Sequence, residues 1–278
     1  MHHILVTGAS SGIGLELARL FAAGGHPLVL VARRAARLTA LAETLRRDHE
    51  VSVHVIPLDL TAPGAVEALV AELARLGLGI RVLVNNAGIG AYGPFLARPL
   101  QVHDDLLELN VAVPMRLAHR LLPAMVAAAG TPGPGPGVLN VASTAAFQPG
   151  PLMASYFAAK AHLLHHSEAL HEELRGRGVT VTAFCPGPTR SGFFTTDAML
   201  PPEARDATGE LVAAARTELA RRDARRMDTA VAARAGYEGF LAGRAVVVPG
   251  VRNRLLTVLV RLLPRGVVRR AAHRGLRR

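Results

Sequence analysis

Short apolar runs alternate with longer amphipathic stretches through most of this 278-residue chain. The spacing of apolar residues predicts strands at 4–7, 28–32, 51–56, 82–84, 138–142, 179–184 and 245–248, and helices at 14–23, 38–45, 65–76, 104–128 and 155–175. Strands joined through helices of this length form a parallel sheet, which must be covered on both faces. The sequence therefore predicts an α/β fold with a doubly wound parallel sheet flanked by helices. Ligands bind such sheets beyond the carboxyl ends of the strands.

The basic character of the chain is confined to one segment. The formal net charge is +11, but residues 250–278 hold nine arginines and no acidic residue, so the rest of the chain is close to neutral. Tryptophan is absent and aromatic residues make up 4% of the chain, which leaves few platforms for stacking bases. We therefore expect no nucleic-acid partner.

Composition also indicates the compartment and the domain organisation. Cys185 is the single cysteine, and no apolar run approaches the roughly 18 residues that cross a bilayer. The first residues lack a basic leader with an apolar core, so we expect a cytoplasmic protein. We expect one domain over residues 1–250, with the Ala- and Arg-rich segment 190–234 as a substrate-lid insertion, and a basic C-terminal extension over 251–278. The Pro- and Gly-rich stretch 131–137 predicts a loop.

A glycine-rich turn, Thr-Gly-Ala-Ser-Ser-Gly-Ile-Gly at residues 7–14, joins the first predicted strand to the first predicted helix. Glycines allow the backbone to approach a pyrophosphate closely, and the helix N-terminus adds positive potential. No Gly-Lys-Ser/Thr follows, which excludes the phosphate loop of nucleotide hydrolases. This turn therefore predicts a dinucleotide site of the Rossmann type.

Arginines follow the second predicted strand, where an NAD-selective site usually has an acidic residue. Arg33, Arg34 and Arg37 crowd the start of the next helix, where the helix dipole disfavours cations. A bound 2′-phosphate would offset that cost, so we expect NADP(H) to be preferred over NAD(H). The alternative is a group of solvated arginines in an arginine-rich chain.

Lys160 is the only lysine among 32 basic residues. The pKa of an ammonium group responds to its surroundings, whereas a guanidinium stays charged. Tyr156 lies four residues earlier and would share its helix face. We expect the ammonium to lower the phenol pKa from about 10, so that Tyr156 can act as a general acid or base. The alternative is one lysine that escaped a compositional drift toward arginine.

Several motifs occur in one order along the chain. They are Thr-Gly-x-x-x-Gly-x-Gly at 7–14, Asp59, Asn85-Asn86-Ala87-Gly88, Asn110, Ser143, Tyr156-x-x-x-Lys160 and Pro186-Gly187. In this order and spacing they resemble the classical short-chain dehydrogenase/reductase family. The resemblance covers roughly residues 1–250 and implies a single NADP-binding domain.

The resemblance implies catalytic roles for four residues. Tyr156 would donate a proton to a substrate carbonyl, and Ser143 would hydrogen-bond the same oxygen. Lys160 would contact the nicotinamide ribose and lower the Tyr156 pKa, and Asn110 would hold a water that links Lys160 to solvent.

The same resemblance implies a cofactor site. It would include Gly8, Ser10, Ser11, Gly12, Ile13, Gly14, Arg33, Asp59, Leu60, Asn86, Ala87, Gly88, Tyr156, Lys160, Pro186, Gly187 and Thr189, with Arg33 facing the adenosine phosphate. The implied activity is that of an NADP(H)-dependent oxidoreductase acting on CH–OH donors, which interconverts a carbonyl and a secondary alcohol. The alternative is a non-catalytic NADP(H)-binding sensor or scaffold protein.

Two features bear on partners. His162 and His166 share a predicted helix face at a spacing that could bind a metal, but no metalloprotease pattern accompanies them, and we expect no metal. By resemblance, the predicted helices 104–128 and 155–175 suggest a homodimer or homotetramer.

The C-terminal extension mixes apolar residues with arginines between Arg252 and Arg265. It could be a helix packed on the substrate side or on a partner subunit, or an amphipathic anchor attracted to anionic lipid. Similar long basic extensions occur in family members that resemble acyl- or lipid-directed reductases. We therefore expect an apolar ketone, aldehyde or acyl compound as the small-molecule substrate.

Overall fold

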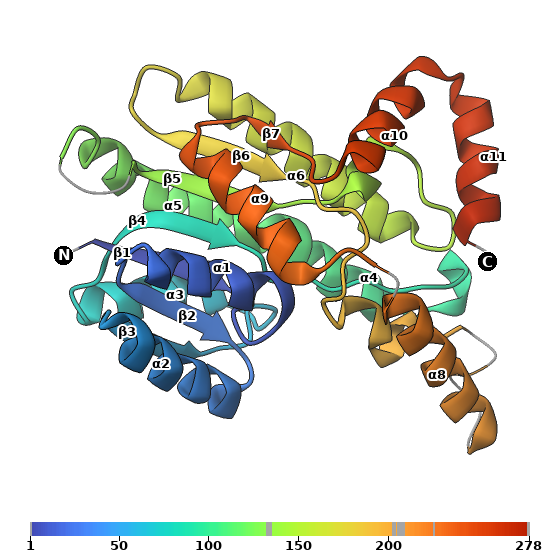
Figure 1. Cartoon of the computed structure of the whole chain (residues 1–278), viewed down its shortest axis with the longest axis horizontal. Coiled ribbons are helices and arrows are strands. Elements are labelled where there is room, and N and C mark those ends of the chain that lie inside the picture. The colour runs from blue at the N-terminus through green and yellow to red at the C-terminus, as the bar shows by residue number, and fades with distance from the viewer. Residues whose placement is uncertain (1, 132–134, 202–203, 205–208, 225, 277–278) are drawn as a thin grey trace.

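The computed structural model describes residues 2–131, 135–201, 204, 209–224 and 226–276 (Figure 1). Within these residues a seven-stranded parallel sheet has the order β3-β2-β1-β4-β5-β6-β7. The strands are β1 (His2–Thr7), β2 (Leu28–Ala32), β3 (Val53–Pro57), β4 (Gly79–Asn85), β5 (Gly137–Val141), β6 (Thr180–Phe184) and β7 (Val246–Val247). Each lies within two or three residues of its predicted range, and the predicted fold class is confirmed.

Helices cover both faces of the sheet. On one face lie α1 (Gly12–Ala23), α2 (Ala35–His49) and α9 (Thr229–Leu241), and on the other lie α3 (Ala65–Arg75), α5 (Val113–Ala127) and α6 (Ala154–Glu173). Strand β1 shows why its sequence is apolar throughout. Ile4 and Val6 face one core while Leu5 faces the other, because successive side chains of a strand point to opposite faces.

The predicted long helix over residues 104–128 is not one regular α-helix. It begins earlier, as α4 (Leu100–Leu107), and passes through a π-helical segment, η2 (Glu108–Ala112), into α5. Asn110 lies in this wider turn, where its amide nitrogen donates to the carbonyl of Leu106 at 2.9 Å. A π segment inside an α-helix frequently marks a functional site. Apolar spacing alone cannot locate such a turn, because its contacts are tertiary.

The segment 190–234 divides into two parts. The first holds short 3₁₀ turns, η4 (Phe193–Thr195) and η5 (Asp197–Met199), and the exposed helix α8 (Glu210–Ala224), which projects from the body in Figure 1. Residues 202–203, 205–208 and 225 lie outside the described residues. The second part, residues 229–234, is the first half of α9. Because α9 packs on α1 and the sheet, these residues lie in the body of the protein and not in the projecting segment.

The C-terminal extension forms two helices, α10 (Val251–Leu262) and α11 (Arg265–Leu276), with Pro264 between them. Figure 1 shows the two helices inclined to each other across the turn at Pro264, near the C-terminus. Among the described residues, none of the helices combines the length and the apolar character that a membrane-spanning segment needs.

Candidate active site

A large cavity of about 1270 Å³ opens at the carboxyl ends of the strands. It extends from the β1–α1 turn to the C-terminal helices and crosses the boundary between β1 and β4, where the order of the strands reverses. This is where doubly wound sheets bind their ligands. Every predicted site residue lines the cavity except Gly14, which packs against the lining residue Asn86, and Asn110, which packs against the lining residue Gly88.

The glycine turn is tied to the loop that follows β4. The Asn86 side-chain amide donates to the carbonyls of Thr7 at 3.0 Å and Gly8 at 3.2 Å. Gly8 and Gly12 have positive φ angles of 66° and 60°, which L-residues with side chains rarely adopt. Gly14 packs so tightly that a Cβ atom there would lie 2.3 Å from Asn86 Nδ2. These contacts bring the N-terminus of α1 against the cavity, as a pyrophosphate would require.

Three arginines, Arg33, Arg34 and Arg37, line this end of the cavity. Arg34 donates from Nη2 to the hydroxyls of Ser10 and Ser11, each at 2.9 Å. Burial, together with repulsion from Arg37 and Arg33, lowers the Arg34 pKa. Additional negative charge here would relieve that repulsion. The predicted site residues include Arg33 but omit Arg34, although the same run of arginines contains both.

Asp59 lies beside these arginines. Its Oδ1 accepts hydrogen bonds from Thr61 N at 3.0 Å and Thr61 Oγ1 at 2.7 Å, and its Oδ2 lies 3.8 Å from Arg33 Nη1. Burial by itself would raise the Asp59 pKa, but the bonds from Thr61 and the charge of Arg33 leave it lowered. Asp59 is therefore an ionised acceptor next to the arginines.

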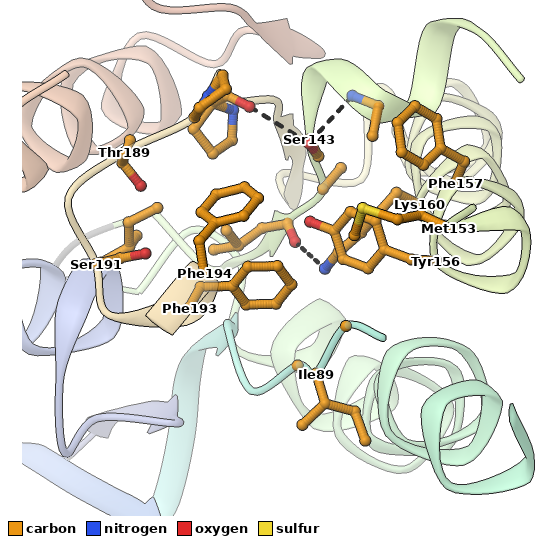
Figure 2. Close-up of a pocket in the computed structure, with 18 of the residues that line it drawn as sticks. Ile89, Ser143, Met153, Tyr156, Phe157, Lys160, Thr189, Ser191, Phe193 and Phe194 are labelled. Atoms are coloured by element: carbon orange, nitrogen blue, oxygen red, sulfur yellow. Dashed lines mark hydrogen bonds between the residues drawn. The ribbon is translucent and has the colours of Figure 1, made fainter. Parts of the chain in front are cut away.

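Ser143, Tyr156 and Lys160 meet near the middle of the cavity (Figure 2). Tyr156 and Lys160 lie one turn apart near the start of α6, and Ser143 precedes the short helix η3 (Thr144–Phe147) after β5. Ser143 Oγ accepts from Ala145 N at 3.1 Å and donates to the carbonyl of Pro186 at 3.5 Å. These bonds fix the hydroxyl at the end of β5, facing the phenol.

Burial dominates the ionisation of both groups on α6. It raises the Tyr156 pKa to about 12, against a hydrogen bond with Ser143 that lowers it. It lowers the Lys160 pKa to about 8. Lys160 Nζ lies 5.8 Å from the centroid of the Tyr156 ring and donates to the carbonyl of Val141 at 2.8 Å. The expected lowering of the Tyr156 pKa is therefore not found in the cofactor-free protein, because burial of the phenol raises the pKa and only the bond with Ser143 opposes that rise.

Asn110 presents an unused acceptor to the same region. Its Nδ2 donates to the carbonyls of Ile89 and Leu106, whereas its buried Oδ1 has no hydrogen-bond partner among the described residues. A Cβ atom on Gly88 would lie 2.5 Å from this Oδ1 and 3.5 Å from Lys160 Nζ. Because Gly88 has no side chain, a gap remains between Asn110 Oδ1 and Lys160 Nζ. A water there would satisfy the buried acceptor.

The opposite end of the cavity is apolar. Met153 and Phe157 of α6 and its N-terminal flank line one side, Phe193 and Phe194 of η4 line the other, and Ile89 lies apart from both groups (Figure 2). The Phe193 ring packs 5.2 Å from the Tyr156 ring and 5.0 Å from the Phe194 ring, measured between centroids.

Arg226 packs against the Phe194 ring of this aromatic pair. The guanidinium carbon of Arg226 lies 3.7 Å from the centroid of the Phe194 ring, and Arg226 also pairs with Asp223 at 2.7 Å. Both charged side chains are largely shielded from solvent. No sequence motif signals this contact, because the partners come from separate parts of the chain.

The C-terminal helices complete the apolar end. Lining residues from α10 and α11 and the turn between them include Leu256, Leu259, Val260, Leu263, Val268, Ala271, Ala272, Gly275 and Leu276. Tyr92 Oη donates to the carbonyl of Leu276 at 2.9 Å and so holds the end of α11 against the body. Of the placements expected for the extension, the structure supports packing on this side of the cavity.

The two histidines of α6 do not take part in the site. The rings of His162 and His166 stack with centroids 5.6 Å apart, and neither lines the cavity. Within the described ranges, no group of three or more His, Cys, Asp or Glu side chains is placed to hold a metal ion.

Comparisons with known proteins agree with this geometry. The family model of short chain dehydrogenases matches residues 2–198. A sulfoacetaldehyde reductase of Chromohalobacter salexigens is 38% identical over 192 residues, which cover 68% of this chain and 73% of that protein.

Two solved structures are similar over nearly the whole chain. A short-chain dehydrogenase from Sphingobium yanoikuyae in complex with NADPH is 31% identical, with a TM-score of 0.74 over 90% of this chain and 88% of that one. A bulky-bulky ketone specific alcohol dehydrogenase from Comamonas testosteroni is 30% identical, with a TM-score of 0.72 over 94% of this chain and 92% of that one. The chain therefore belongs to the short-chain dehydrogenase/reductase family of oxidoreductases, which act on CH–OH groups with NAD(P).

Proposed function

We propose that this protein is an NADP(H)-dependent carbonyl reductase of the cytoplasm, with an apolar ketone, aldehyde or acyl compound as substrate. One observation carries the proposal. Ser143, Tyr156 and Lys160 converge midway along a cavity that has arginines at one end and apolar side chains at the other. Such a cavity suits a phosphorylated cofactor and an apolar carbonyl compound that meet beside the phenol.

The positions of the side chains support the catalytic roles proposed for them. Tyr156 Oη donates its proton to the carbonyl oxygen, and Ser143 Oγ stabilises the charge that develops there. NADPH, when bound, supplies the hydride. A phenol pKa of about 12 keeps Tyr156 protonated in the free enzyme, which suits a proton donor. Lys160, with a pKa of about 8, can exchange a proton near neutral pH and restore the phenol.

Asn110 completes this set as a positioning residue. Its free Oδ1 and Lys160 Nζ face one gap beside Gly88. A water held there would carry protons between Lys160 and solvent. The two bonds that Asn110 Nδ2 donates within and beside the π segment keep the side chain directed at that gap.

The arginines support NADP(H) over NAD(H). Arg33, Arg34 and Arg37 gather where β2 ends, and Asp59 is the acid beside them. Arg34 already binds two serine hydroxyls of the glycine turn, so its guanidinium is held close to the cofactor end. A 2′-phosphate would meet positive charge at this position.

The apolar end supports a bulky substrate. Its walls come from η4, α6, α10 and α11, and the cavity as a whole is larger than most sites for a single small ligand. The similar enzyme from Comamonas testosteroni is described as specific for bulky-bulky ketones. We extend a preference for bulky ketones to this protein.

The exposed apolar side chains of η1 (Phe95–Ala97) and α4 support a homodimer or homotetramer. Phe95, Leu96 and Leu100 face solvent in the single chain, beside the start of α6. Burial of such side chains between subunits would be favourable. Sedimentation velocity of the purified protein tests this assignment.

NADPH oxidation over a panel of apolar ketones, aldehydes and 3-oxoacyl compounds tests the proposed activity. Tyr156→Phe should lower kcat by about 10²-fold or more and leave the affinity for NADPH within about threefold, because it removes only the transferable proton. NADPH binding without oxidation across the whole panel would favour the sensor or scaffold alternative. Near-normal turnover by the Tyr156→Phe variant would contradict the proposed acid.

A further inference from the structure

We propose that α10 docks the protein on an anionic lipid bilayer through its outward face. Val251, Leu255, Val258 and Leu262 recur at spacings of four, three and four residues, which places them in one stripe along the helix. They are 71%, 66%, 54% and 77% exposed. None of them lines the cavity, so the stripe is separate from the candidate active site.

Helix α10 therefore has two apolar faces with different surroundings. Thr257 is buried, and Leu256 and Val260 line the cavity on the inner face. Helices on the surface of a soluble domain usually bury one apolar face and leave a polar one outside. The outer stripe of α10 departs from this pattern, because its four apolar side chains remain more than half exposed in the single chain.

The charge of the C-terminal extension indicates which kind of partner could cover the stripe. The C-terminal extension holds nine arginines and no acidic residue. On α10, Arg252 lies toward one edge of the stripe and Arg254 toward the other, where Arg254 Nε also donates to the carbonyl of Val248 at 2.9 Å. The Arg261 guanidinium turns to the Phe147 ring, 5.1 Å from its centroid. On α11, exposed positions are occupied by Arg269, Arg270 and Arg274. A second copy of this face would bring the same positive charges together, which costs free energy. The partner must instead be anionic.

An anionic lipid surface would complement both the exposed apolar stripe and the positive charge of the arginines. The aliphatic stripe can enter the boundary between headgroups and acyl chains, while the guanidinium groups bind lipid phosphates. A nucleic acid would meet the charge but would gain nothing from four exposed aliphatic side chains. The length of the stripe, about three turns of helix, suits a helix that lies in the plane of the interface.

Docking through this face would also set the orientation of the cavity. The inner faces of α10 and α11 line its apolar end, so that end would lie close to the bilayer. This consequence rests on the proposed function, since it concerns the entry of an apolar substrate from the membrane. The docking itself does not depend on catalysis.

Co-sedimentation of the full-length protein with vesicles tests the proposal without any substrate. We expect binding to vesicles of phosphatidylcholine and phosphatidylglycerol, little binding to phosphatidylcholine alone, and release as salt is raised. Leu255→Ser combined with Leu262→Ser should weaken binding by about tenfold or more, because both leucines of the stripe, 66% and 77% exposed, become polar.

A matched control comes from another helix. Leu211→Ser on α8 removes an equally exposed leucine, at 66%, from a surface outside the stripe, and should bind vesicles like the wild type. NADPH binding by all variants shows that each one is folded. Three results would overturn the proposal: recovery of the wild type in the supernatant with anionic vesicles, equal binding by the double variant, or a wild-type dimer that the double variant converts to monomer.

Discussion

Lys160 is a buried ammonium that donates to a main-chain carbonyl. Its acceptor is the oxygen of Val141, and burial lowers its pKa to about 8. Within the described part of the chain no carboxylate pairs with it, so the charged form costs roughly 3 kcal/mol relative to an exposed lysine. A lysine can respond to such a site by losing its proton, whereas an arginine cannot. This difference gives a physical reason for one lysine in a chain of arginines.

The ionisation of Lys160 can be measured directly, because the chain contains one lysine. Biosynthetic ¹³C-lysine labelling gives a single Cε resonance, and its titration in the cofactor-free protein should have a midpoint near pH 8. The folded pKa lies below that of the unfolded chain. The cost of the buried charge is therefore present below about pH 8 and disappears as the pH rises from about 8 to about 10.5. A midpoint near 10.5 would show that the ammonium is solvated.

At the scale of elements, the sequence predicted the strands and helices, whose apolar patterns are local. It missed features that depend on contacts between distant residues. Buried parallel strands read as apolar runs, and the helices show their period in the sequence, so β1 and α1 were placed closely. Asn110 was identified, but not the π segment that holds it, because its carbonyl partner at Ile89 lies on another loop. The extension was expected to contain a helix before Pro264, and the structure adds a second helix, α11, after it.

In the candidate site, too, residues in local motifs were predicted and residues brought together only by the fold were not. Residues in motifs were found from sequence, since most follow a strand end and the fold brings strand ends together. Phe194 and Arg226 belong to no motif, and they meet only because η4 and the segment after α8 fold toward each other. The pKa of Tyr156 could not be predicted either, because burial depends on the aromatic and aliphatic side chains that surround the phenol.

The Arg226–Phe194 contact should act on substrate binding more than on the chemical step. A cation–π contact of a shielded guanidinium is worth about 1 kcal/mol or more. Loss of it in Arg226→Ala would free η4 and the Phe193 ring beside Tyr156. We expect KM for the carbonyl substrate to rise about five- to tenfold, with kcat changed less than about threefold.

The control for this prediction is Arg222→Ala, on α8. Arg222 pairs with Glu218 on the exposed surface, and exposed ion pairs contribute little. Steady-state kinetics of both variants should therefore separate the aromatic contact from a general loss of charge in this part of the chain. A drop in kcat with unchanged KM in Arg226→Ala would assign this arginine to the chemistry instead.

At the scale of the whole molecule, the sheet order separates the two ends of the cavity. The strands on one side of the β1–β4 boundary carry the glycine turn and the arginines, and those on the other side carry Ser143 and lead into Tyr156. The C-terminal helices then close the second side with apolar residues. Under the proposed function, cofactor preference and substrate preference would be set by parts of the chain that scarcely overlap, so we expect each to be changed by substitution without the other.

Cofactor preference should be visible as a difference in the stability of the whole chain. A ligand that binds only the folded state stabilises it in proportion to the logarithm of its affinity. If NADPH binds about tenfold more tightly than NADH, equal saturating concentrations should separate the two melting temperatures by about 3–5 °C. Arg33→Asp should reduce or reverse that difference, because an acid repels the 2′-phosphate and accepts hydrogen bonds from ribose hydroxyls. Arg177→Asp, an exposed substitution outside the cavity, should leave the difference unchanged. Equal shifts from both cofactors in the wild type would mean that the three arginines serve only as solvated surface charges.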